Sequence, residues 1–242
     1  MKPISSNWHN LLFDLFLPAF CHTCQKGLKA GDGNYFCSGC WAEIVLLDKF
    51  CSRCGYPSFK ASPPAHCHKC PTEKIGFRYA RSVGIYAGIM SQAIHLFKYK
   101  NKIGMGSQLA GLLITHYARY WEFWNYDYIV PVPLHPRRLR QREFNQSFIL
   151  ASELGNYFQT PVLADNLQRI KFNRPQVELN QQERLNNLKG GFDLTQPQVI
   201  KGKNILLIDD VYTTGATVTE CAQIAATAGA NVVDIYTLAR TL

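Results

Sequence analysis

The 242-residue sequence lacks long hydrophobic runs, although 47% of its residues are hydrophobic. No stretch approaches the roughly 20 uncharged apolar residues that a membrane-spanning helix needs. The nearest segment, residues 8–20, is interrupted by Asp14 and ends in Pro18-Ala19-Phe20, without the small residues of a signal-peptide cleavage site. We therefore expect a cytoplasmic protein with no membrane insertion and no secretory or lipoprotein signal.

Charged residues are also few, at 18%, and the acidic ones are scarcer: 17 Asp and Glu stand against 26 Lys and Arg. This composition excludes a disordered or collagen-like chain. The positive charge is concentrated in residues 75–203, which carry a net charge of +9. Two basic runs lie there: Lys98, Lys100 and Lys102, and then Arg137, Arg138, Arg140 and Arg142. The runs favour a polyanion or polyphosphate as partner, and a solvated basic face is the alternative.

Cysteine, in contrast, is abundant and regularly spaced. Eight of the nine cysteines form C-x-x-C pairs before residue 71, and two pairs separated by twelve residues recur thirty positions later. The first set is Cys21, Cys24, Cys37 and Cys40, and the second is Cys51, Cys54, Cys67 and Cys70. In a reducing cytoplasm this spacing indicates metal binding rather than disulfides.

Each set supplies four thiolates, which suit tetrahedral zinc and leave no open position for a substrate. We therefore predict two structural zinc ions, one in each half of the repeat. A cross-braced pairing of alternate knuckles remains open, and an iron–sulfur cluster is the chemical alternative. Cys221, alone on an apolar helix, is predicted to lie in the core.

Beyond the cysteines, strand and helix patterns alternate, which predicts an α/β fold with an open, mostly parallel sheet preceded by the small Cys-rich region. We expect an amphipathic helix in residues 1–20, a double zinc ribbon in 21–74 and the α/β domain in 75–242. Strands are expected at 81–86, 128–132, 161–164, 204–209 and 232–238. Helices are expected at 90–97, 103–124, 144–158, 180–187 and 216–228, with a Pro- and Arg-rich loop after residue 132.

The segment 204–217, N-I-L-L-I-D-D-V-Y-T-T-G-A-T, combines a buried strand, two carboxylates and a turn that opens a helix. Backbone N–H groups at a helix N-terminus favour a phosphate, and Gly215 lets the backbone approach it. The carboxylates of Asp209 and Asp210 can accept hydrogen bonds from vicinal hydroxyls. The pattern therefore predicts a site for a ribose 5-phosphate.

This segment resembles the signature of type I phosphoribosyltransferases, which bind 5-phosphoribosyl-1-pyrophosphate (PRPP) with Mg²⁺. The resemblance implies that Asp209 and Asp210 contact the ribose hydroxyls. It implies that the 5-phosphate is held by Thr213, Thr214, Gly215, Ala216 and Thr217. Lys98 or Lys100 and the arginines after Val132 would then neutralise the pyrophosphate.

The whole chain resembles the ComF family, which combines a double zinc ribbon with a phosphoribosyltransferase-like domain. The likeness rests on the cysteine repeat, V-P-V-P-L at 130–134 with F-N-Q-S at 144–147, R-x-x-x-N-x-x-Q at 169–176, and I-D-D-V-Y-T-T-G-A-T at 208–217. Two positions depart from the family pattern: Glu143 replaces a usual glycine, and Asn173 replaces a usual threonine.

The family resemblance implies a role in natural transformation, the uptake and handling of DNA, with single-stranded DNA and other DNA-uptake proteins as partners. We therefore expect a competence-type DNA-handling protein built on a PRPP-binding fold. The alternative is an active, Mg²⁺-dependent transferase that moves phosphoribose from PRPP to an acceptor that the sequence does not identify.

Overall fold

The computed structural model describes residues 19–29, 32–33, 35–58, 67–70, 75–99, 102–121, 125–171 and 190–242. The chain forms two compact units, Met1–Ile44 and Val45–Leu242. The division between them falls between the two cysteine sets, so each unit contains one set. The helices expected at residues 1–20 and 180–187 lie outside the described residues, except for Ala19 and Phe20 at the end of the first.

The first unit is a small ribbon built around its cysteines. An antiparallel bridge joins Phe20 to Gly27, and the short helix α2 spans Ser38–Ala42. The Asp32 carboxylate accepts hydrogen bonds from the backbone N–H groups of Lys29 and Ser38, each at 2.8 Å. The side chain of Asp32 thus supplies hydrogen-bond acceptors for backbone amides that have no partner in a helix or sheet.

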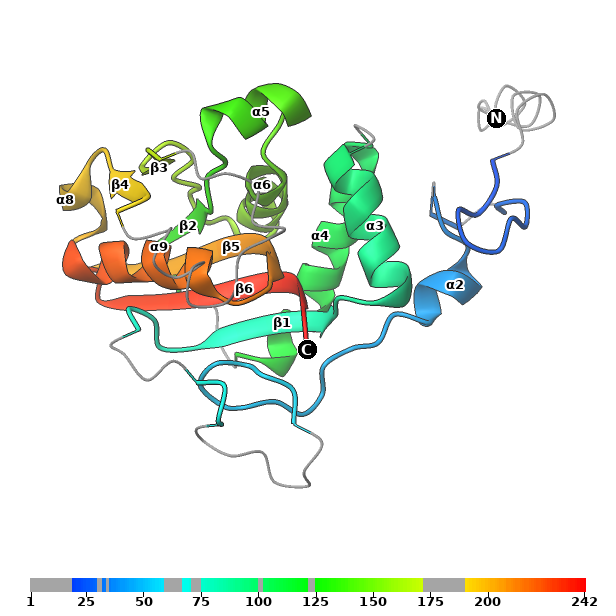
Figure 1. Ribbon diagram of the computed structural model, residues 1–242, viewed down its shortest axis with the longest axis horizontal. Helices are drawn as coiled ribbons and strands as arrows, with labels where there is room; N and C mark the ends of the chain where they lie inside the picture. The colour runs from blue at the N-terminus through cyan, green and yellow to red at the C-terminus, as the bar shows by residue number, and fades with distance from the viewer. Residues whose placement is uncertain are drawn as a thin grey trace, which may run out of the picture. The chain divides into compact units, whose positions relative to one another are not determined.

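The second unit contains a four-stranded parallel sheet with strand order β1-β6-β5-β2 (Figure 1). Its strands are β1 (Ala80–Ile85), β2 (Tyr128–Pro131), β5 (Asn204–Tyr212) and β6 (Val232–Arg240). The apolar run of β5 is buried from Ile205 to Ile208, as expected for a central parallel strand covered on both faces. The parallel sheet confirms the predicted fold class.

Helices cover both faces of this sheet. On one face, Ile205 and Leu207 belong to the same apolar cluster as Cys221 of α9 (Ala216–Thr227). On the other face, the Tyr236 hydroxyl donates to the Leu113 carbonyl of α4 (Gly104–His116) at 2.8 Å. The other helices described in this unit are α3 (Gly88–Tyr99), the 3-10 turn η1 (Tyr117–Arg119), α5 (Pro136–Arg142), α6 (Gln146–Phe158) and α8 (Pro197–Ile200). None of the helices in the described ranges has both the length and the apolar character needed to cross a membrane.

The strands differ from the expectation in two places. The segment 161–164 forms only a single parallel bridge, between Val162 and Ile129. An unpredicted antiparallel pair, β3 (Leu167–Arg169) and β4 (Phe192–Leu194), lies apart from the main sheet. Each strand has three residues, too few for a period of two to be visible in the sequence.

The second cysteine set is joined to the α/β domain by backbone hydrogen bonds. The Ala80 amide at the start of β1 donates to the Arg53 carbonyl at 2.9 Å, and the Leu47 amide donates to the Val83 carbonyl at 2.9 Å. The second ribbon is therefore continuous with the sheet within one compact unit.

Candidate functional site

Two carboxylates at the carboxyl end of β5 form the centre of the candidate site. The Ser147 hydroxyl, in the first turn of α6, donates to Asp209 Oδ1 at 2.9 Å, and the Asp210 amide donates to the same oxygen at 2.9 Å. Lys98 Nζ, near the end of α3, lies 2.8 Å from Asp210 Oδ1. Three elements far apart in sequence thus meet at the acidic pair, at the sheet edge where α/β folds bind ligands.

The electrostatics of the pair make its two members different. Burial and the charge of Asp210 raise the pKa of Asp209 to about 7. Burial lowers the pKa of Lys98, but the negative charges of Asp210 and Asp209 outweigh it and hold that pKa above its ordinary value. At neutral pH a charged Lys98 ammonium group therefore lies close to the carboxyl group of Asp209, which is easily protonated.

The predicted phosphate turn follows directly. Gly215 caps α9 with φ 77°, and Thr214 Oγ1 accepts from the Ala216 amide at 3.4 Å. A Cβ on Gly215 would lie 2.2 Å from the Tyr212 hydroxyl oxygen. Both the backbone conformation and the space therefore require glycine here. The turn leads directly into the first turn of α9, the place where the sequence predicts a phosphate site.

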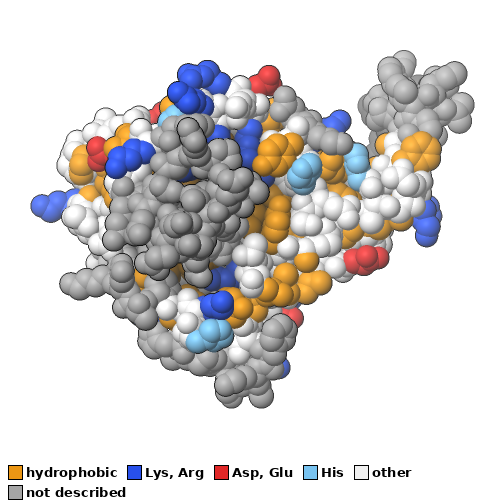
Figure 2. All heavy atoms as spheres, viewed as in Figure 1, with side chains coloured by type: hydrophobic (Ala, Val, Ile, Leu, Met, Phe, Trp, Pro, Cys, Tyr) orange, Lys and Arg blue, Asp and Glu red, His pale blue; other side chains and the backbone are white. Residues whose placement is uncertain are grey.

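The arginines after Val132 form a helix, which corrects the expected loop. Pro136 occupies the first turn of α5, and His135 Nδ1 accepts from the Arg137 amide at 3.1 Å. Proline is favoured in the first turn of a helix, and Arg and Leu are good helix formers. With the cap at His135, these residues form a helix although the content of Pro and Arg suggested a loop. None of the residues of α5 is buried, and Figure 2 shows Lys and Arg side chains gathered over this helix.

The four arginines do not share one environment. Arg142 donates to Tyr99 and to Gln146, each at 3.1 Å, and its guanidinium stacks over the Tyr99 ring at 4.9 Å. Arg137 and Arg140 are exposed. The structure therefore brings Arg142 toward the acidic pair, whereas Arg137 and Arg140 face solvent. Lys100 lies outside the described residues.

A pocket of about 480 Å³ lies between α5, the start of α6 and strand β3. Apolar side chains dominate its wall, including Leu139 and Phe148, which are both 41% exposed. Phe148 is on the apolar side of α6 by helical periodicity, and in the structure it lines this pocket. Arg169 also lines the pocket, and burial together with the charge of Arg138 lowers the Arg169 pKa.

Several of these contacts were missed from the sequence. Ser147, Gln146 and Arg169 lie in segments that carry the family resemblance, but no role followed from the residue types alone. The departure at Glu143 has a structural meaning: this residue ends α5 with φ 65°, in the left-handed region that favours glycine. Asn173 lies outside the described residues.

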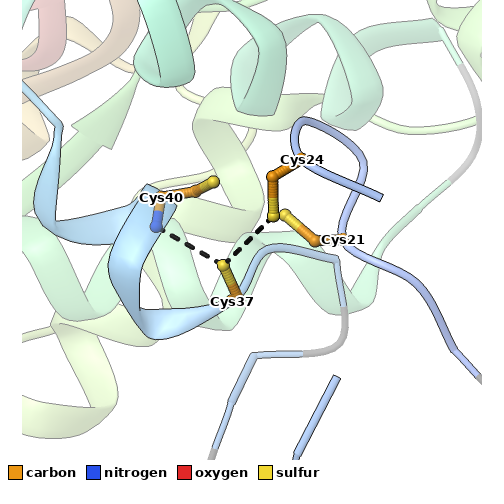
Figure 3. A group of neighbouring side chains, drawn as sticks. All are labelled: Cys21, Cys24, Cys37 and Cys40. Carbon is orange, nitrogen blue, oxygen red and sulfur yellow. Dashed lines mark hydrogen bonds between the residues drawn. The ribbon is translucent and has the colours of Figure 1, made fainter. Parts of the chain in front are cut away.

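The eight paired cysteines form the two groups that the spacing predicted. One contains Cys21, Cys24, Cys37 and Cys40, and the other contains Cys51, Cys54, Cys67 and Cys70. Within each group the ligand atoms lie within 4.8 Å of one another. The Sγ atoms of Cys24 and Cys37 are 3.7 Å apart (Figure 3), and those of Cys51 and Cys70 are 3.5 Å apart. Sulfurs bound tetrahedrally at about 2.3 Å from one zinc ion lie about 3.8 Å apart, so both groups fit zinc.

Backbone donors also prepare one thiol of each group for a metal. Burial raises the pKa of Cys21, but hydrogen bonds from the amides of Cys24, Cys37 and Thr23 outweigh it and lower the pKa to about 6. The same balance lowers the pKa of Cys51 to about 7. Because the thiolate is the metal ligand, this donor arrangement favours zinc binding.

Comparison with known proteins agrees with this architecture. Residues 12–71 match the Double zinc ribbon domain, and residues 145–242 match the Phosphoribosyl transferase domain. The molecule is thus a double zinc ribbon joined to a phosphoribosyltransferase-like domain, and its two cysteine groups are structural zinc sites.

Three similar proteins match most of this chain. DNA utilization protein YhgH of Escherichia coli is 32% identical over 94% of this chain and 100% of its own. Competence protein F of Haemophilus influenzae is 29% identical over 91% of this chain and 96% of its own. Competence protein ComFC of Bacillus subtilis is 28% identical over 81% and 73% respectively. The chain belongs to the ComF family.

Proposed function

We propose that this chain is a competence-type DNA-handling protein whose α/β domain binds PRPP or a related ribose phosphate together with Mg²⁺. The observation that carries the proposal is the juxtaposition of Asp209 and Asp210 with the Gly215 turn at the carboxyl end of β5. The names of its relatives, which refer to competence and DNA utilization, support the cellular role.

In this proposal the acidic pair receives the ribose hydroxyls and the turn Thr213–Thr217 receives the 5-phosphate through backbone amides. Mg²⁺, when bound, would neutralise the pyrophosphate. Lys98 is held by Asp210 at 2.8 Å, so the approach of a pyrophosphate would give this ammonium group a second anionic partner. Arg142, next to the same site, is the arginine of α5 best placed to add positive charge.

Calorimetric titration with PRPP and Mg²⁺ tests the site. We expect the Asp209→Asn/Asp210→Asn double variant to lose binding while the fold survives, and the matched surface variant Asp193→Asn to bind as the unmodified chain does. Because a carboxylate accepts from hydroxyls better than a carboxylic acid, affinity should increase as the pH rises through about 7, the pKa of Asp209. Unchanged affinity in the double variant would refute the assignment.

Single-stranded DNA is proposed to bind along α5 through its phosphates, without strong sequence preference. The solvent-facing Arg137 and Arg140 supply the charge, and the adjoining pocket with Leu139 and Phe148 offers an apolar wall for a base. Replacing both arginines by alanine should lower the slope of log affinity against log salt by about 1.4, because each single-strand contact contributes about 0.7. The control Lys201→Ala should keep the original slope.

Competition distinguishes two arrangements of these ligands. If PRPP displaces the DNA, both bind one groove; if it does not, the DNA lies on another face. No binding of single strands at low salt would refute DNA handling and leave the second candidate function, phosphoribosyl transfer. The pocket beside α5 favours that candidate, because it has room for an acceptor and Asn145 in its wall lies two residues before Ser147, which contacts Asp209. Pyrophosphate release from PRPP with added acceptors would demonstrate turnover.

A further inference from the structure

The second cysteine set is held by two buried arginines of the sheet. Arg240, at the end of β6, donates from Nη1 to the Cys54 carbonyl at 2.6 Å. Arg81, on β1, donates from Nη2 to the Ser52 carbonyl at 2.6 Å. Both arginines are more than nine-tenths buried. The knuckle Cys51-x-x-Cys54 is therefore fixed to the strands by charge-assisted hydrogen bonds in a site with little water.

Arg240 continues from the knuckle to the end of β5. Its guanidinium lies over the Tyr212 ring at 3.8 Å from the ring centre, and Tyr212 is its neighbour in the β5–β6 pairing. Only 4% of Arg240 and 2% of Tyr212 is exposed. A cation stacked on an aromatic face without competing water is at the strong end of this interaction.

Tyr212 in turn lies directly beneath the phosphate turn. Its hydroxyl oxygen would be only 2.2 Å from a Cβ on Gly215, so the ring fills the space against which the turn is folded. The next residue after Arg240, Thr241, donates its amide to the Tyr212 carbonyl at 3.1 Å and its hydroxyl to the Thr213 carbonyl at 3.3 Å. One continuous set of contacts thus runs from Cys54 through Arg240 and Tyr212 to the turn.

We infer that Arg240 and Tyr212 are positioning residues through which the second zinc ribbon holds the phosphate-binding turn in shape. Folding of the Cys51–Cys70 site around zinc fixes the Cys54 carbonyl, this carbonyl orients Arg240, and the stacked Tyr212 ring supports the Gly215 turn. Zinc in the second ribbon therefore controls affinity for the ribose phosphate, whereas zinc in the first does not. The inference rests on the proposed function of the turn.

The test uses the full chain loaded with zinc and ribose 5-phosphate as the probe, because this probe reports on the turn without a pyrophosphate. We expect Tyr212→Leu to weaken binding about tenfold, equivalent to about 1.4 kcal/mol, and Tyr212→Phe to restore it because the ring remains. Arg240→Gln should weaken binding to a similar extent. Cys24→Ser, which disrupts only the first zinc site, should bind like the unmodified chain.

Amide hydrogen exchange of residues 213–217 provides a second readout that needs no ligand. Exchange there should accelerate in Tyr212→Leu, and it should stay unchanged in Tyr212→Phe and Cys24→Ser. If the unmodified chain does not bind the probe, the proposed function fails, and the exchange pattern still shows whether Tyr212 supports the turn. If Arg240→Gln does not fold, the comparison of Tyr212→Leu with Tyr212→Phe remains as the test. Folded Tyr212→Leu with unchanged binding and unchanged exchange would overturn the inference.

Discussion

The two zinc ribbons have the same ligand spacing but opposite surroundings. In the first ribbon, the Cys21 amide donates to Lys26 and the His22 amide to Tyr35, all within the same small unit. In the second, the carbonyls of Ser52, Arg53 and Cys54 accept hydrogen bonds from the α/β sheet. Repetition of a sequence motif therefore does not imply repetition of its role: one copy lies in a small compact unit of its own, and the other is part of the unit that carries the candidate site.

The knuckles themselves show the difference at equivalent positions. The residue after the second cysteine of the knuckle is Gln25 in the first ribbon, with φ 59°, and Gly55 in the second, with φ 69°. Both have left-handed backbone, so the turn geometry is shared. The two positions differ in the space around them. A Cβ on Gly55 would lie 2.3 Å from the Ala80 carbonyl oxygen, whereas Gln25 is exposed.

The largest expected difference concerns the zinc ligands. Cys54→Ser should remove one zinc and lower the free energy of unfolding of the α/β domain by more than about 3 kcal/mol, since structural zinc contributes about 10–16 kcal/mol in small zinc-binding domains. Cys24→Ser should also remove one zinc but leave the main unfolding transition in place. Zinc analysis and denaturant unfolding followed by circular dichroism measure both effects. Equal losses of stability would contradict the division of roles.

A reciprocal exchange at the knuckles should give the next largest effect. Gly55→Gln introduces a side chain at positive φ and against the backbone of β1, so we expect a loss of more than about 2 kcal/mol. Gln25→Gly relieves a left-handed residue and removes only an exposed 3.4 Å hydrogen bond from this side chain to the His22 carbonyl, so it should stabilise the first unit by up to about 1 kcal/mol. Thermal unfolding of the two single variants provides the measurement. A neutral Gly55→Gln would show that the second knuckle is not confined by the sheet.

How far the sequence predicted this arrangement depends on the distance between the partners. The β5–turn–α9 segment and both cysteine groups were predicted correctly, because short-range spacing and strand patterns encode them. The sequence did not predict the pairing of Lys98 with Asp210 or the contact of Arg240 with Cys54. Both join residues far apart in the chain that only the tertiary fold brings together. No local pattern distinguishes an arginine that anchors a ribbon from one that faces solvent.

A smaller effect is expected from the aromatic residue that precedes each knuckle. Phe50 lies under the Arg81 guanidinium at 4.9 Å and packs against the Tyr120 ring at 5.5 Å. Phe50→Ala should therefore destabilise the second unit by about 2 kcal/mol. Its counterpart Phe20 is 52% exposed, and Phe20→Ala should change stability by less than about 0.5 kcal/mol. Denaturant unfolding of both variants would reveal whether the aromatic position supports one ribbon or both.

The smallest perturbation leaves the fold intact and compares the rates at which the ribbons release zinc. Both groups contain two buried cysteines, but the first also contains the exposed Cys24, whereas no cysteine of the second group is exposed. A chelator must reach a ligand or the metal to displace it, so the first site should exchange zinc several-fold faster than the second. The Cys24→Ser variant reports the second site alone, and its release should match the slow phase of the unmodified chain in a colorimetric chelator assay. If instead the slow phase disappears in Cys24→Ser, the first ribbon is the better protected of the two, and the contacts of Arg81 and Arg240 do not shield the second zinc.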